Sequence, residues 1–110
     1  MTNYNREGMC AHTYIVYTAV TMSNFIKLEK QLKAVGNQRR LRILSFLKRN
    51  RSATVEEICK TVGIKSQSAS QHLRILRNAD IVTYSKRGLF VTYRLYLPQK
   101  QPIKQVISLL

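Results

Sequence analysis

The stretch TVEEICKTVGIKSQSASQHLRILR, residues 54–77, carries the strongest structural signals in this chain of 110 residues. Thr54 and Glu57 form a T-x-x-E capping box, in which each side chain satisfies a free backbone N–H at the start of a helix. Gly63 supplies a left-handed turn after that helix, and Ser66 is a suitable N-cap for the next one. These residues predict two helices joined by a tight turn.

Regular patterns on both sides of this stretch complete the fold. Apolar residues recur at helical spacing before it and alternate with polar residues after it. The expected elements are helices at 23–35, 38–48, 55–62 and 66–78, strands at 81–86 and 89–97, and a helix at 103–110. The turn signal Lys86-Arg87-Gly88 joins the strands into a hairpin with a basic tip. This order predicts a winged helix-turn-helix, a mainly α fold with a small β-hairpin (α+β).

Residues 1–22 differ in character from residues 23–110. They carry little charge, many β-branched and Tyr residues and no clear period. An extended arm, a strand added to a dimer and an upstream extension of a gene that starts at Met22 are all compatible with this composition. Residues 23–110 are expected to form the DNA-binding and dimerisation domain. The apolar segment 10–22 falls short of the ~20 residues that a membrane span needs, so no membrane contact is expected.

The charge balance favours a polyanionic partner. Nineteen Lys and Arg residues face five Asp and Glu residues, for a net charge of +14, and the excess lies entirely after Met22. Neutralising phosphates with such residues releases counterions and drives binding to nucleic acid. With so few acids and no nucleophile motif, we expect neither an enzyme nor a small-molecule substrate. A basic architectural protein that coats DNA or RNA with little sequence preference remains the alternative.

The exposed face of the helix at 66–78 carries Ser, Gln, His and Arg, which suits the major groove of double-stranded DNA. We expect base edges to be read by Gln67, Ser68, Ser70 and Gln71. Contacts with phosphates are expected from Ser66, Arg39, Arg40, Arg74 and Arg77. In the wing, Lys86 and Arg87 are expected to reach the minor groove or the flanking phosphates. His72 is expected to pack within the domain with one hydrogen bond rather than to bind metal.

The apolar faces of the first and last helices have no obvious partner within the chain, so a homodimer is expected. The residues expected at this interface are Phe25, Leu28, Leu32, Ile103, Val106, Ile107 and Leu110. A symmetric dimer places two such helices in successive major grooves and therefore predicts a palindromic operator.

The two cysteines, Cys10 and Cys59, are far apart and form no C-x-x-C motif. This usage favours a reducing cytoplasm over a disulfide framework. Cys59 is expected to be a small core residue, and a redox switch that pairs it with Cys10 is the less favoured alternative. No spacing of ligands predicts a metal site, and no cofactor is expected.

Three segments resemble the ArsR-type family of regulators. The segment LKAVGNQRRLRILSFL (residues 32–47) resembles the family's LKALGdptRlrILxLL, and KSQSASQHLRILRNADIV (residues 65–82) resembles its recognition-helix signature lsqsavSqHLkvLreAGlV. The hairpin that ends at residues 92–95 is similar to the family's GrxvyYrL wing. The resemblance covers about residues 28–97 and implies a dimeric, cytoplasmic winged-helix repressor. Many members release DNA when they bind a metal or when a thiol is oxidised.

Two departures from the family pattern bear on metal sensing. Metal-sensing members carry a Cys-x-Cys type motif on the third helix, where this chain has Thr54-Val55-Glu56-Glu57. Other members bind metal with Asp and His on the last helix, whereas residues 99–110 contain no Asp, Glu, His or Cys. The resemblance therefore supports DNA binding but not regulation by a metal.

Overall fold

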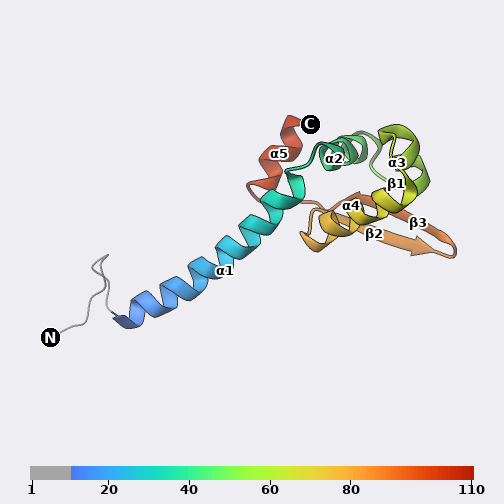
Figure 1. Ribbon diagram of the computed structural model, residues 1–110. Coiled ribbons are helices and arrows are strands. Elements are labelled where there is room, and N and C mark those ends of the chain that lie inside the picture. Colours follow the sequence, from blue (N-terminus) through green and yellow to red (C-terminus); the bar gives the residue numbers. More distant parts are fainter. Residues whose placement is uncertain (1–10) are drawn as a thin grey trace. The chain divides into compact units, whose positions relative to one another are not determined.

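The computed structural model describes the backbone of residues 11–110 and the side chains of residues 23–110. The described elements are α1 (Ala11–Val35), α2 (Gln38–Asn50), β1 (Ala53–Thr54), α3 (Val55–Val62), α4 (Ser66–Asn78), β2 (Val82–Arg87), β3 (Phe90–Leu95) and α5 (Ile103–Leu109) (Figure 1). By their contacts the described residues divide into two units, one ending at Lys30 and the other running from Gln31 to Leu110. The expected mainly α fold with a small antiparallel sheet is confirmed.

Helix α1 begins twelve residues earlier than its sequence pattern predicts, at Ala11 instead of Ser23. Residues 11–22 are thus helical rather than an extended arm or a strand. This part of the helix could not be predicted from the sequence, because its β-branched and Tyr residues have modest helix propensity and its apolar residues show no helical period. The division of the chain at Met22 stays a prediction, and Cys10 lies outside the described residues.

Helix α2 begins where the sequence indicates. The side-chain oxygen of Asn37 accepts hydrogen bonds from the backbone N–H groups of Arg39 at 3.0 Å and Arg40 at 3.2 Å. Asn37 is therefore the expected N-cap. The helix runs to Asn50, two residues beyond the predicted end, and Arg51 follows with a positive φ of 60°.

The sheet has three antiparallel strands in the order β1-β3-β2. Strand β1 was not predicted, because its two residues are too short to show alternation. Strands β2 and β3 pair from Val82↔Leu95 to Arg87↔Phe90, so Gly88 and Leu89 form the turn. The φ of 60° at Gly88 suits a two-residue hairpin turn with Gly at its first position. The predicted basic tip is therefore wrong in detail, since the basic residues end β2 and an apolar residue occupies the tip.

Helices α3 and α4 have the predicted bounds. Gly63 between them adopts the left-handed conformation, with φ 76° and ψ 42°. The predicted N-cap of α4 is wrong by one residue. Lys65 has the extended backbone of an N-cap, and its carbonyl accepts the N–H of Ala69 at 2.9 Å, so Ser66 is already helical. Thr54 accepts the N–H of Glu57 at 3.2 Å, which confirms its capping role for α3.

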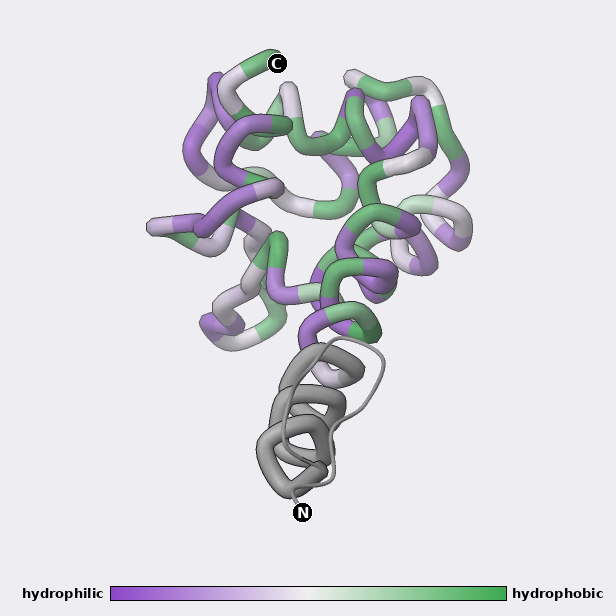
Figure 2. The backbone as a smooth tube through the Cα atoms, turned by 90° about the vertical axis from the view of Figure 1, so that its left-hand side faces the viewer, coloured by the Kyte–Doolittle hydropathy of each residue, from purple (hydrophilic) through white to green (hydrophobic). Residues whose placement is uncertain are grey.

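The core of residues 31–110 lies between the helices and the sheet. The coloured helical turns carry both hydrophobic and hydrophilic residues, as expected for helices with one buried and one exposed face (Figure 2). Burial of one such large apolar side chain stabilises the fold by about 1.5–3 kcal/mol. The largest fully buried side chains are Ile43, Leu44, Leu47, Ile58, Leu73, Leu76, Ile81, Val82 and Ile103.

Helix α5 belongs to this core, which corrects part of the predicted dimer interface. Ile103 is 0% exposed and Ile107 is buried, while Val106 and Leu110 are half-buried against the same cluster. These side chains are covered within one chain, so Ile103 and Ile107 are not available to a second copy. The Nζ of Lys48 donates a hydrogen bond to the carbonyl of Ile107 at 3.0 Å. This hydrogen bond links the end of α5 to α2.

Candidate nucleic-acid interface

Helix α4 has one buried and one exposed face. The buried face is fully covered and consists of Ala69, Leu73 and Leu76. The other face repeats at three- and four-residue spacing and exposes Gln67, Ser70, Gln71 and Arg74. The core therefore fixes the rotation of α4 about its axis and turns these polar groups outward.

Three of the four predicted base-reading residues share this exposed face. Gln67, Ser70 and Gln71 are exposed, whereas Ser68 is half-buried at its margin. A Gln side chain can pair with both the donor and the acceptor of an adenine edge, and a Ser hydroxyl can donate or accept. The arrangement suits hydrogen bonding to base edges.

The start of α4 offers unpaired backbone donors. No side chain caps it, and its first turn contains no acidic residue. The N–H of Ala69 is bonded to the carbonyl of Lys65, so the N–H groups of Ser66, Gln67 and Ser68 have no partner within the helix. Such groups, at the positive end of the helix dipole, suit a phosphate oxygen. Lys65, which sequence reasoning had missed, adds a positive charge at this point.

Arg77 holds the end of α4 against the wing. Its guanidinium lies over the ring of Tyr84, 4.9 Å from the ring centroid, and the rings of Tyr84 and Tyr93 are 5.9 Å apart. A guanidinium that stacks on a ring keeps its in-plane N–H groups free for a phosphate. The stack places Arg77 beside the hairpin, a contact that the sequence could not show because it joins two elements.

Arg40 differs from the other predicted phosphate contacts because it is directed into the fold. Its Nε donates to Nδ1 of His72 at 3.2 Å, and its Nη1 donates to the carbonyls of Lys33 at 3.1 Å and Ala34 at 3.4 Å. A contact from Arg40 to phosphate would cost these hydrogen bonds. Arg39, its neighbour, is exposed and free of that constraint.

His72 has the structural role that the sequence suggested. It is half-buried, and Nδ1 accepts the hydrogen bond from Arg40, which places the proton of the neutral ring on Nε2. Burial lowers the pKa of His72 below its ordinary value of 6.5, and the charges of Arg40 and Arg39 lower the pKa further. The neutral form therefore supports the junction between α2 and α4.

The lowered pKa of His72 predicts a loss of stability in acid. Because the unfolded chain binds a proton at His72 more readily than the folded chain does, the free energy of unfolding should fall as the pH drops below about 6.5. In His72→Asn, whose side-chain oxygen can accept from Arg40, this fall should be shallower. Urea denaturation between pH 5 and pH 8 measures it. Equal slopes in His72→Asn and wild type would contradict this role.

The wing carries exposed cations and an apolar turn. Lys86 and Arg87 are exposed at the end of β2, as a minor-groove or phosphate contact requires. Leu89 in the turn and Phe90 after it are exposed as well, and neither was singled out from the sequence. Along the hairpin, the hydroxyls of Ser85 and Thr92 lie 3.1 Å apart across the two strands.

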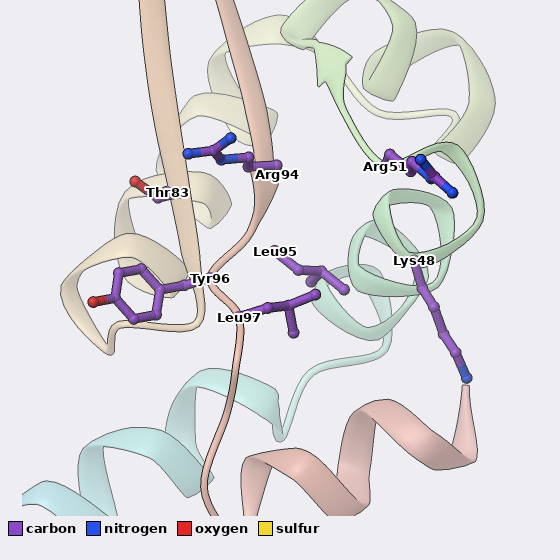
Figure 3. Close-up of a pocket in the computed structure, with 7 residues that line it drawn as sticks. All are labelled: Lys48, Arg51, Thr83, Arg94, Leu95, Tyr96 and Leu97. Atoms are coloured by element: carbon purple, nitrogen blue, oxygen red, sulfur yellow. The ribbon is translucent and has the colours of Figure 1, made fainter.

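A surface pocket of about 620 Å³ lies between the end of α2 and the base of the hairpin. Its lining includes three cations that sequence reasoning did not single out, Lys48, Arg51 and Arg94. In Figure 3, Arg94 points across the sheet, away from Arg51, and Lys48 extends from α2 to the end of α5, where its Nζ donates to the carbonyl of Ile107. The cations do not converge on one point, so the pocket adds positive surface without the geometry of a ligand site.

The described residues give no metal cluster. Within them, no three His, Cys, Asp or Glu side chains gather closely enough to hold an ion. Cys59 is half-buried on α3 and is not among the buried core residues, so its expected place in the core is not reached. None of the described helices is long and apolar enough to cross a membrane.

A helix-turn-helix whose second helix exposes hydrogen-bonding groups, with a cationic hairpin beside it, defines the winged helix-turn-helix class of DNA-binding proteins. Residues 37–84 match the family described as "Bacterial regulatory protein, arsR family". This chain belongs to the ArsR family and is a DNA-binding transcriptional regulator.

Similar proteins extend this comparison over most of the chain. An uncharacterised helix-turn-helix-type transcriptional regulator of Methanocaldococcus jannaschii is 33% identical over 88 residues, which cover 80% of this chain and 96% of that protein. The transcriptional repressor SdpR of Bacillus subtilis is 33% identical over 63 residues, covering 57% and 69%. The homodimeric winged helix-turn-helix domain of a possible ArsR-family regulator from Mycobacterium bovis is 25% identical, with a TM-score of 0.70, and the match covers 81% and 79%.

Proposed function

We propose that this chain is a repressor that binds a palindromic operator as a homodimer. The observation that carries the proposal is the outward face of α4, where Gln67, Ser70 and Gln71 are exposed above a fully buried apolar face. Hydrogen-bonding groups held on a rigid helix suit the reading of base edges in the major groove. Repression follows by occlusion, because a dimer that covers promoter DNA excludes other proteins from it.

Two observations support the dimer. Helix α1 exposes large apolar side chains, among them Phe25 and Leu28, and Leu32 is exposed as well. The similar domain from Mycobacterium bovis is described as homodimeric. With Ile103 and Ile107 assigned to the core, we place the proposed interface on α1 and on the outer side of α5, where Leu109 is 76% exposed. A two-fold dimer presents two copies of α4 to successive major grooves, roughly one helical turn apart.

The proposal also includes a cytoplasmic protein without enzymatic activity, metal or other cofactor. The absence of a metal is supported by the side chains at the two places where metal-sensing members of the family carry ligands. The start of α3 holds Thr54, Glu56 and Glu57 in place of paired cysteines, and residues 99–110 contain no metal-binding side chain. A redox switch at Cys59 is the remaining route to regulation, and comparison of DNA binding with and without reductant tests it.

The second candidate function is an architectural protein that coats DNA or RNA with little sequence preference. The net charge of +14 favours it, since charge alone binds any polyanion. Salt weakens both kinds of complex, but only a regulator keeps a large ratio of specific to nonspecific affinity as salt rises.

The proposal predicts different effects for two substitutions on the DNA-binding surface. Gln71→Ala should weaken binding to a selected operator by roughly tenfold and leave binding to random duplex DNA unchanged, because it removes base contacts alone. Arg87→Ala should weaken both complexes equally and lower the salt slope by about one, because it removes a phosphate contact. Titration of the two duplexes at several salt concentrations measures all of these quantities.

The operator for this experiment comes from selection of wild-type-bound sequences out of random duplex DNA. Arg49→Ala is the matched control for loss of charge, because it removes one positive charge near the end of α2 at a position to which no DNA contact is assigned; its Nη2 lies 3.5 Å from the Oγ of Ser45. Equal losses on selected and random duplexes for Gln71→Ala would contradict base reading by α4 and favour the architectural function.

A further inference from the structure

The turn of the wing carries two adjacent apolar side chains that the fold does not use. Leu89 is 96% exposed, more than any other large hydrophobic residue in the described part of the chain, and Phe90 is 73% exposed. Leu89 and Phe90 together form the apolar tip of the wing. Single exposed hydrophobic residues are common, but two at the end of a hairpin form a small protruding patch.

The conformation of the turn does not require an apolar residue at position 89. Gly88, with φ 60°, already meets the conformational demand at the first position of the turn. The second position ordinarily takes a small polar residue such as Asn or Ser, which hydrogen-bonds within the turn. A leucine there contributes neither turn geometry nor core packing, so its side chain is available for contact with something outside the chain.

The nearest part of the chain does not cover the apolar tip. A pocket of about 600 Å³ separates Leu89 and Phe90 from the first turn of α3, which lines it with Glu56 and Glu57. Lys60 lies 3.6 Å from Glu56 and offsets part of that charge. Phosphates are repelled by these carboxylates and attracted to Lys86 and Arg87 on the strand next to the tip.

The two cations beside the tip favour a polyanionic occupant. Lys86 and Arg87 bring the tip to a polyanion, and the exposed hydrocarbon then needs an apolar surface between the charges. The minor groove of DNA has that composition, with phosphates on both rims and deoxyribose and base edges inside. Apolar wedges in the minor groove partly unstack base steps and bend the duplex in other DNA-binding proteins.

We propose that the apolar tip enters the minor groove beside each half-site, with Leu89 as a wedge that partly unstacks one base step and bends the operator. Phe90 supports Leu89 from the paired end of β3, and Lys86 and Arg87 hold the phosphates at the rims. This inference rests on the proposed function, because it needs the wing to lie on DNA. It adds a residue that acts on DNA shape rather than on base edges or phosphates.

The experiment uses the full chain and its selected operator, with 2-aminopurine substituted in turn at each base step that flanks the half-sites. Wild type should raise the fluorescence at one step under each wing, since unstacking relieves quenching. Leu89→Asn should abolish the increase, reduce the bend measured by energy transfer between the duplex ends, and weaken binding by about five- to twentyfold. Its salt slope should match that of wild type, because no phosphate contact is lost.

Two further variants make the result specific. Leu89→Met keeps an apolar side chain and should retain both the fluorescence increase and the affinity, whereas Arg87→Ala should lower the salt slope and keep the increase. Asn is well tolerated in turns and Leu89 packs in no core, so Leu89→Asn should unfold at the same urea concentration as wild type.

Leu89→Asn with the fluorescence, bend and affinity of wild type would overturn the wedge. Equal DNA binding, together with loss of co-sedimentation on anionic vesicles, would overturn it in favour of a membrane surface. A wild type that binds selected and random duplexes equally would instead refute the proposed function. In that case, the insertion of Leu89 is still tested by comparing the fluorescence of a labelled duplex bound to wild type with that of the same duplex bound to Leu89→Asn.

Discussion

Leu73→Ala is expected to lower the free energy of unfolding by about 3 kcal/mol. Leu73 is 0% exposed and lies on the buried face of α4, between Ala69 and Leu76. The substitution removes apolar contact and leaves a cavity that the surrounding helices close only in part. Urea denaturation followed by circular dichroism at one fixed protein concentration measures the change. Operator binding should weaken in parallel, because the same packing sets the rotation of α4.

Ser70→Ala, three residues earlier on the exposed face, is the matched control. It should change the free energy of unfolding by less than about 0.5 kcal/mol, as is usual for an exposed position, yet weaken binding to the operator. A Leu73→Ala protein as stable as wild type would contradict the placement of that side chain in the core. If Ser70→Ala binds the operator as tightly as wild type, Ser70 does not contact the bases.

Ile103→Ala is the second substitution with a large expected effect, a loss of about 2–4 kcal/mol in the free energy of unfolding. Ile103 is fully buried at the start of α5 and packs against the core cluster that includes Leu44 and Leu47. The loss should appear in unfolding of the single chain, so it should persist at protein concentrations where any dimer has dissociated.

Leu109→Ala tests the other side of α5. Leu109 is exposed, so the variant should unfold like wild type at low protein concentration but form a weaker dimer, as measured by analytical ultracentrifugation. An Ile103→Ala protein that loses only its dimer, with unchanged unfolding of the single chain, would restore Ile103 to the interface and contradict its burial.

Local signals predicted the helix-turn-helix almost residue for residue. The bounds of α3 and α4 follow from Thr54, Gly63 and the apolar period, because capping and left-handed turns depend on neighbouring residues alone. Asn37 marked the start of α2 for the same reason. The predicted N-cap of α4 was wrong by one residue because Ser is a favoured N-cap residue. In the structure, the first hydrogen bond of the helix is accepted by the carbonyl of Lys65, so Lys65 is the N-cap.

Features that depend on distant partners could not be read from the chain. Strand β1 exists because Ala53 and Thr54 pair with Tyr93 and Thr92, about forty residues away. The turn of the wing falls at Gly88 and Leu89 because the pairing of β2 with β3 sets the register. The second finding replaced the predicted basic tip with an apolar tip that follows two basic residues, Lys86 and Arg87.

The candidate site divides in the same way. Gln67, Ser70 and Gln71 were predictable because their spacing places them opposite the apolar residues of one helix. Arg40 was expected on the outer face by its position in α2, yet it turns inward to His72. The stack of Arg77 on Tyr84 likewise joins residues from a helix and a strand.

The sequence by itself determined that this chain folds as a helix-turn-helix with a cationic wing, because helix caps, apolar periods and net charge depend on residue type and spacing. Only the tertiary structure decided which side chains remain available to a partner. It buried Ile103 and Ile107, drew Arg40 into the fold, and left Leu89 exposed at the end of the wing. The reason is that burial depends on which surfaces meet in three dimensions, and the same apolar residue is core or contact according to what lies against it.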